Sequence, residues 1–248
     1  MRFSVLLPLL ALLVSGCGRS LYTSQALDAQ ALHQHKTVAI LPFDVRIETV
    51  KMADLTIGGV VPTPEEVERM VNDAYAGTDL TAAQIEQRKQ AAIASRELRQ
   101  RLISYQMQQA VQEQLQRQRG HRYSVAFQEV LETNRRLQKA GITYDNLPDH
   151  TMQELQSALG VDAIFSGQVT LYQSLPKPIA AAMSVMTNVG IPPSHIAANL
   201  TIHDCNNGKL VWKFDQQVVG NLGAKPGTLA KALVHNSAHG FPYQLTNN

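Results

Sequence analysis

The chain has 248 residues and a formal net charge of +2, with 22 basic and 20 acidic side chains. This length suits one large domain or two small ones. The near balance of charge lacks the clustered basic surface with which proteins usually bind nucleic acids, so we expect no nucleic-acid partner.

The first residues have the pattern of a secretory signal peptide. A basic start is followed by an apolar run that ends at Val14. This run of about twelve residues is shorter than the roughly twenty that cross a bilayer. The segment VSGC (14–17) resembles the bacterial lipobox, whose cysteine is diacylated and becomes the first residue. The resemblance implies that 1–16 is removed and that Cys17 carries the lipid. The alternative is an ordinary signal peptide that happens to end at a cysteine.

The residue after the cysteine bears on the location of the protein. Gly18 stands where lipoproteins kept in the inner membrane usually have aspartate. The resemblance therefore implies an outer-membrane lipoprotein that faces the periplasm. Several acyl chains, such as palmitate, make a firm anchor because each buried methylene contributes ~0.8 kcal/mol. With Cys17 acylated, Cys205 is the one thiol left in the sequence, and we expect it to be buried.

Polarity and patterning suggest the domain organisation. Residues 17–36 are polar and unpatterned, which favours a lipidated N-terminus and flexible tether. Residues 37–243 are expected to form a single α/β domain, with 44–80 as an insertion and 244–248 as a tail. The β-branched run KTVAILPF (36–43) predicts a central strand buried on both faces.

A long helix is predicted after the insertion. The insertion itself holds a capping pattern, TPEE from Thr63, that predicts a short helix. Residues 80–120 then predict one helix about 60 Å long, at 1.5 Å per residue. It carries two opposite apolar stripes: Leu98, Leu102 and Tyr105 on one side, and Ile103, Met107, Ala110, Val111 and Leu115 on the other.

One stripe is enough for a helix that packs on a single sheet. The stripe that begins at Leu98 is therefore either covered by the insertion or exposed as a surface for a partner or a second copy. Residues 179–193 raise a similar choice because they are apolar and uncharged. We expect Met183, Val185 and Met186 to form a contact surface, with a buried loop as the alternative.

The remaining elements alternate between strand and helix. Strands are predicted at 123–130 and 161–173, with a short helix from Leu131 to Gly141 and another beginning at the Thr151 capping box between them. A hairpin turning at Asn207-Gly208 is followed by a last helix. This order predicts an α/β fold with a mixed β-sheet flanked by helices.

Two sequence segments carry a family resemblance. The pairing of TVAILPF with LGVDAIFSGQVTLY resembles the envelope fold shared by the TolB amino-terminal domain, the penicillin-binding-protein activator LpoB and the curli-secretion lipoprotein CsgG. The segments LTIHDCNNGKLVWKFD and LAKALVHNSAHGFPY are similar to a family of uncharacterised bacterial lipoproteins, over roughly 36–243. The resemblance implies contact with other proteins in the periplasm, sometimes ring assembly, and no catalytic residues.

Motifs for catalysis are missing from the sequence. It holds no GxSxG serine elbow, no phosphate-binding GxxxxGK[ST] and no dinucleotide fingerprint. His235 and His239 have a zinc-like spacing, but no third ligand is evident, and Cys205 beside His203 lacks an orienting group. We therefore expect no enzyme, no cofactor and no metal.

The leading hypothesis is a membrane-anchored periplasmic lipoprotein that acts as a non-enzymatic binding or scaffold factor for another envelope protein. The alternative is a self-assembling ring or secretion-channel component like the curli lipoprotein. A channel needs membrane-crossing strands of about nine to eleven alternating residues. The two candidate segments, 44–61 and 179–193, do not alternate cleanly.

Overall fold

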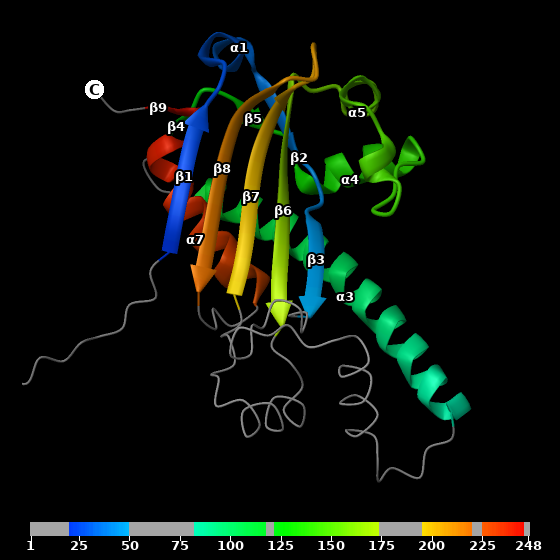
Figure 1. The fold of residues 1–248 in the computed structure, drawn as a ribbon. Helices are drawn as coiled ribbons and strands as arrows, with labels where there is room; N and C mark the ends of the chain where they lie inside the picture. The colour runs from blue at the N-terminus through cyan, green and yellow to red at the C-terminus, as the bar shows by residue number, and fades with distance from the viewer. Residues whose placement is uncertain (1–19, 50–81, 118–121, 174–194, 220–224, 246–248) are drawn as a thin grey trace, which may run out of the picture.

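A seven-stranded mixed sheet forms the centre of the protein (Figure 1). The computed structural model describes residues 20–49, 82–117, 122–173, 195–219 and 225–245. The strands are β1 (Ser20–Ala26), β2 (Thr37–Ile40), β3 (Asp44–Thr49), β4 (Arg122–Tyr123), β5 (Ala126–Phe127), β6 (Ala163–Gln173), β7 (His195–Asp204), β8 (Leu210–Val219) and β9 (Gln244–Leu245). Their order is β1-β8-β7-β6-β2-β5, β3 also pairs with β6, and β4 pairs separately with β9.

Two helices cover one face of this sheet. The helices are α1 (Ala29–Gln34), α3 (Ala82–Arg117), α4 (Val130–Lys139), α5 (Met152–Leu159) and α7 (Pro226–Ser237), with short 3-10 turns η2 (Leu147–Asp149) and η3 (Ala238–Gly240). Figure 1 shows α3 and α7 behind the strands. Their apolar residues join the inward side chains of the hairpin in the main core: Ile103, Met107, Val111, Leu115, Leu229, Leu233, Val234, Leu200, Ile202, Trp212 and Phe214.

The opposite face is covered in part. α4 and α5 pack over the corner formed by β2 and β6, where a second core holds Leu41, Leu137, Leu155, Leu159, Ile164 and Cys205. Along β6 the residues on this face then change from Ile164 to Ser166, Gln168 and Thr170, which are partly exposed. Among the described residues, therefore, the rest of this face is polar and open. The predicted α/β class with a mixed, helix-flanked sheet is confirmed.

The predicted central strand is confirmed and continues further than expected. β2 runs parallel to β6 with Val38 opposite Ala163, and β3 continues beside the same strand with Asp44 opposite Gln168. Between them the chain bends at Pro42, and the Phe43 ring fills the space where a Cβ on Gly167 would stand. The prediction that the insertion begins at residue 44 is wrong, because 44–49 is a strand.

The prediction that residues 17–36 form a flexible tether is also wrong, because 20–26 is a strand and 29–34 a helix. β1 adds an antiparallel edge strand to β8 through seven residue pairs, from Ser20↔Val218 to Ala26↔Trp212. α1 follows, with the side chain of Asp28 accepting a hydrogen bond from the backbone N–H of Ala31. Backbone pairing to a neighbouring strand, which a single-strand pattern does not reveal, stabilises this segment.

Other local predictions hold with shifted ends. The Thr151–Glu154 capping box is present, and Gly160 ends α5 with a φ of 65°. The predicted strand at 123–130 is reduced to two short pieces, β4 and β5, and α4 already begins at Val130. Part of the expected tail forms β9. The helix predicted from Thr63 lies outside the described residues.

Candidate functional site

The predicted lipidation and loop-contact residues lie outside the described part of the chain. These are Cys17, Met183, Val185 and Met186. Their roles therefore stay predictions. Among the described residues, no helix is long and apolar enough to cross a bilayer.

The apolar stripe predicted on α3 is exposed. Leu98, Leu102 and Tyr105 have 70%, 56% and 40% of their surface accessible. At 100° per residue they fall within about 60° of one another on the helix circumference. On the opposite side of the helix, Ile103 and Met107 are buried in the core. The two opposite apolar stripes predicted on α3 are thus confirmed. The partner contact of the exposed stripe stays a prediction, and most of the insertion that is the alternative cover, 50–81, lies outside the described residues.

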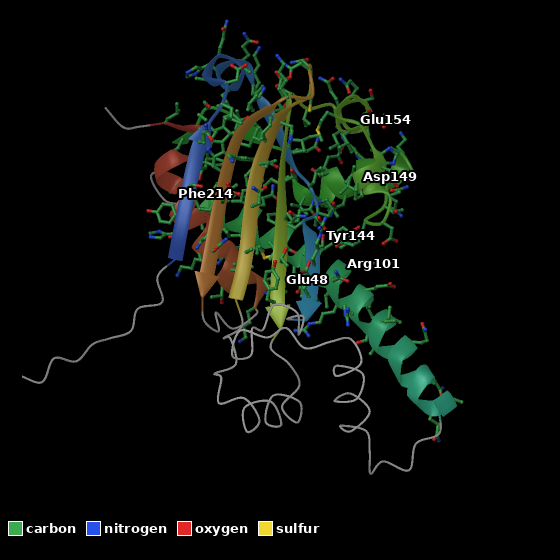
Figure 2. All side chains as sticks on the ribbon, viewed as in Figure 1. Glu48, Arg101, Tyr144, Asp149, Glu154 and Phe214 are labelled. Atoms are coloured by element: carbon green, nitrogen blue, oxygen red, sulfur yellow. The ribbon has the colours of Figure 1, made fainter. Side chains whose placement is uncertain are left out.

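The exposed stripe begins where α3 leaves the body of the protein. Gln100 donates from Nε2 to the backbone oxygen of Val45 in β3, at 2.8 Å. The guanidinium of Arg101 lies 2.8 Å from the Asp145 carboxylate, in the loop after α4. Figure 2 shows Arg101 beside Tyr144 at this place, and beyond it the helix extends away from the strands. These contacts fix the direction of residues 82–99, the free half of α3, which projects away from the strands.

A polar surface covers the open face of the sheet. Its side chains hydrogen-bond across neighbouring strands, with Gln168 donating to Asp44 at 2.8 Å and Asn199 donating to Asp215 at 2.6 Å. A groove of about 460 Å³ lies between this surface and the segment from Tyr144 to Leu155. The side-chain amides of Gln168 and Asn199 are thus bonded to carboxylates within the same face.

A buried polar cluster ties the N-terminal segment to the C-terminus. His35, after α1, pairs through Nδ1 with the Tyr243 hydroxyl at 2.7 Å, and its Nε2 lies 3.9 Å from Asp204. Burial lowers the pKa of His35, although Asp204, Asp162 and Asp28 act in the opposite direction. The neutral imidazole is therefore favoured in the folded protein. This cluster was not predicted from the sequence. The one local signal for α1 is Asp28, a favoured N-cap residue that precedes an alanine-containing run.

The cysteine beside this cluster is unsuited to nucleophilic chemistry. Cys205 is fully buried, as expected, and burial raises the pKa of its thiol to about 12. The thiolate is the reactive form, and almost none is present near pH 7. Burial also lowers the pKa of His203. Among the described residues, no group of three potential metal ligands comes together.

Comparison with known proteins gives distant structural similarity. No family model matches the sequence, and no curated protein matches it. Among solved structures, the PelC dodecamer from Paraburkholderia phytofirmans is 10% identical and matches with a TM-score of 0.37 over 92% of this chain and 100% of that one. Lipoprotein GNA1162 from Neisseria meningitidis is 12% identical, with a TM-score of 0.33 over 82% and 96%.

The LpoB C-terminal domain from Salmonella enterica is 8% identical, with a TM-score of 0.29 over 75% of this chain and 83% of that one. The matches thus include a bacterial lipoprotein. All three TM-scores are low, and they indicate a distant likeness only.

Proposed function

We propose that the protein is a lipid-anchored, non-enzymatic factor of the bacterial cell envelope that binds another envelope protein through the exposed stripe on α3. Acylated Cys17 holds it in the outer membrane, facing the periplasm. Leu98, Leu102 and Tyr105 form the centre of the contact.

The exposure of the stripe carries this proposal. Fully burying one leucine side chain contributes roughly 1.5–3 kcal/mol, and Leu98 and Leu102 leave most of their surface in water. Protein interfaces place apolar and aromatic residues at the centre and polar residues around them. Arg99, Arg101 and Gln109 are exposed around the stripe in that manner. A helix surface of this kind is suited to bind the groove of a partner.

The contact is tested by placing a photo-crosslinking residue at Leu98 in the full chain within intact cells. Leu131 is the matched control, because it is an exposed leucine (82% accessible) on α4, away from the stripe. We expect a specific adduct from position 98 and none from position 131. Equal adducts from both positions, or none from position 98, would contradict the proposed contact.

The mass of the adduct separates the two classes of partner. An adduct of the chain with a different protein supports the binding factor, whereas one of twice the chain mass indicates a second copy and the self-assembling ring. Light scattering of the mature chain carrying Cys17→Ser gives an independent answer in solution. A strict monomer there rules out self-assembly by the protein surface alone.

The anchor has its own test. Cys17→Ala, placed behind a signal peptide whose cleavage does not require a cysteine, removes the sulfur that the acyl groups require, so the variant is expected in the soluble fraction of the periplasm. Fractionation after cell lysis measures this directly. Retention of the variant in the membrane fraction would refute the lipid anchor while leaving the α3 contact open.

A further inference from the structure

We infer that the end of the sheet at which β1 begins faces the bilayer, so that the stripe on α3 meets its partner close to the membrane surface. The inference rests on the lipid anchor of the proposed function and adds an orientation and a partner class. The partner is a protein embedded in or attached to the same membrane.

The link between the lipid and the sheet is very short. Cys17 precedes Ser20 by three residues, and Ser20 is already paired with Val218 at the end of β8. A fully extended chain spans at most about 3.6 Å per residue, so Ser20 lies within about 11 Å of the acylated residue. That distance is about a third of the ~33 Å that a strand of ten residues, such as β8, extends.

β1 cannot easily lengthen this link by detaching from the sheet. All seven of its residues pair with β8. In addition, the Ser24 hydroxyl donates to the backbone oxygen of Gly240 at 3.2 Å and accepts from Nε1 of the buried Trp212 at 3.2 Å. Peeling β1 away would break these bonds together with the strand pairing, so the first strand acts as a rigid part of the body.

The two ends of the sheet differ accordingly in their distance from the membrane. At the anchored end β1 and β7 begin and β3, β6 and β8 finish, and the free half of α3 extends beyond the strands on that side (Figure 1). The opposite end carries α1, α5 and the turn at 205–209. With the acyl chains in the bilayer, the first end is held near the head groups and the second is directed into the periplasm.

This orientation places the exposed stripe near the end of the molecule that faces the membrane. Gln100 is fixed to Val45 in β3, and β3 runs from there toward the anchored end. Leu98 lies two residues before Gln100, in the free half of α3, which runs obliquely away from the strands and beyond the same end of the sheet (Figure 1). A partner that binds the stripe is therefore contacted near the membrane, which is where a membrane-bound protein is accessible.

Two labels on one strand measure the orientation. Lys209 and Gln217 are exposed and lie just before and near the end of β8, eight residues and about 27 Å apart. Each is replaced by cysteine in the mature acylated protein and labelled with a fluorophore. The buried Cys205 and the acylated Cys17 do not compete for the label. The protein is then incorporated into phosphatidylcholine vesicles that contain a lipid with a quencher on its head group.

Strong quenching is expected for the label at position 217 and little for the label at position 209. Equal quenching, or stronger quenching at position 209, would overturn the orientation. Failure of the lipid anchor gives a different result, because the protein then does not float with the vesicles at all. The two proposals therefore fail separately.

A longer link between Cys17 and β1 provides the second test of the orientation. A flexible Gly-Ser insert of twenty residues between Arg19 and Ser20 has an end-to-end distance of roughly 25 Å, comparable to the strand. The altered protein should still float with the vesicles but lose the difference between the two labels. The adduct from Leu98 in cells should also decrease. If the difference between the labels persists with the long link, the short link does not set the orientation.

Discussion

The two halves of α3 belong to one continuous helix, yet they lie in opposite environments. From Ile103 to Leu115 the helix buries an apolar side chain at every fourth residue against the sheet and α7. Between residues 91 and 99 every side chain is exposed. Helical periodicity is present in both halves, so it does not decide which half is buried. What decides is where the sheet ends.

The largest effect expected from this comparison is a stability difference within α3. Met107 is completely buried and Leu98 is 70% accessible. Met107→Ala leaves a cavity and should lower the free energy of unfolding by about 2–5 kcal/mol. Leu98→Ala should change it by at most about 0.5 kcal/mol, because it removes almost no buried surface. Urea unfolding followed by circular dichroism measures both; equal losses would mean that the free half is packed in solution.

A second pair of variants tests the polar contacts of the packed half. Buried Gln108 donates from Nε2 to the backbone oxygen of Ile40 at 2.7 Å and exchanges two hydrogen bonds of 3.0 Å with the Asn134 amide. Gln108→Leu leaves these groups without partners and should lower stability by about 1–3 kcal/mol.

The adjacent residue supplies the control. Gln109 is exposed, and its side chain donates to the carboxylate of Glu113, one turn further along α3. Gln109→Leu should therefore alter the free energy of unfolding by about 0.5 kcal/mol or less. A loss at position 109 as large as the loss at position 108 would show that burial does not separate the two glutamines.

The boundary between the halves was beyond sequence reading for a physical reason. The opposite stripes of α3 and the Thr151 capping box depend on residues three or four positions apart, so a local pattern reveals them. The end of the sheet beside α3 depends on β3 pairing with β6, more than 120 residues away. A non-local pairing of this kind leaves no short-range signal, so the sequence alone places residues 44–49 in the insertion.

The same reasoning explains why the tether was wrongly predicted at the N-terminus and why the hairpin at Asn207-Gly208 was correctly predicted. β7 and β8 alternate around a turn with Gly208 at a φ of 70°, so both strands and their connection are visible together. β1 pairs with β8 across almost two hundred residues and has few apolar side chains of its own. The candidate site on α3 could be predicted in part for the same reason. Its apolar residues follow from the helical spacing in the sequence, whereas their exposure depends on the tertiary structure.

A smaller effect is expected from pH, and it should act on the packed half. Burial lowers the pKa of His35 below its ordinary value of about 6.5, while Asp204, Asp162 and Asp28 offset part of the effect. The Tyr243 hydroxyl is hydrogen-bonded to the ring. The unfolded chain therefore binds more protons below about pH 6.5, and stability should fall as the pH drops from there toward the folded pKa.

Hydrogen exchange along α3 can follow this pH dependence. After correction for the intrinsic exchange rate, protection from Ile103 to Leu115 should decrease between pH 7 and pH 5, while residues 91–99 stay weakly protected throughout. His35→Gln should reduce the slope, although the partly buried His203, whose pKa is also lowered, contributes in the same direction. A slope of unchanged size in this variant would assign the dependence to other groups.

The smallest effect is expected from the ion pair at the boundary itself. Arg101 and Asp145 are 2.8 Å apart, with 49% and 60% of their side-chain surfaces accessible. Exposed pairs of this kind contribute about 0–1 kcal/mol and weaken with added salt. A double-mutant cycle with Arg101→Ala and Asp145→Ala should therefore give a coupling in that range. Crosslinking from Leu98 should persist in Arg101→Ala if the direction of the free half of α3 is determined by the Gln100–Val45 hydrogen bond and by the buried residues that begin at Ile103. A large coupling energy together with loss of the adduct would instead show that the Arg101–Asp145 pair determines the orientation of the stripe.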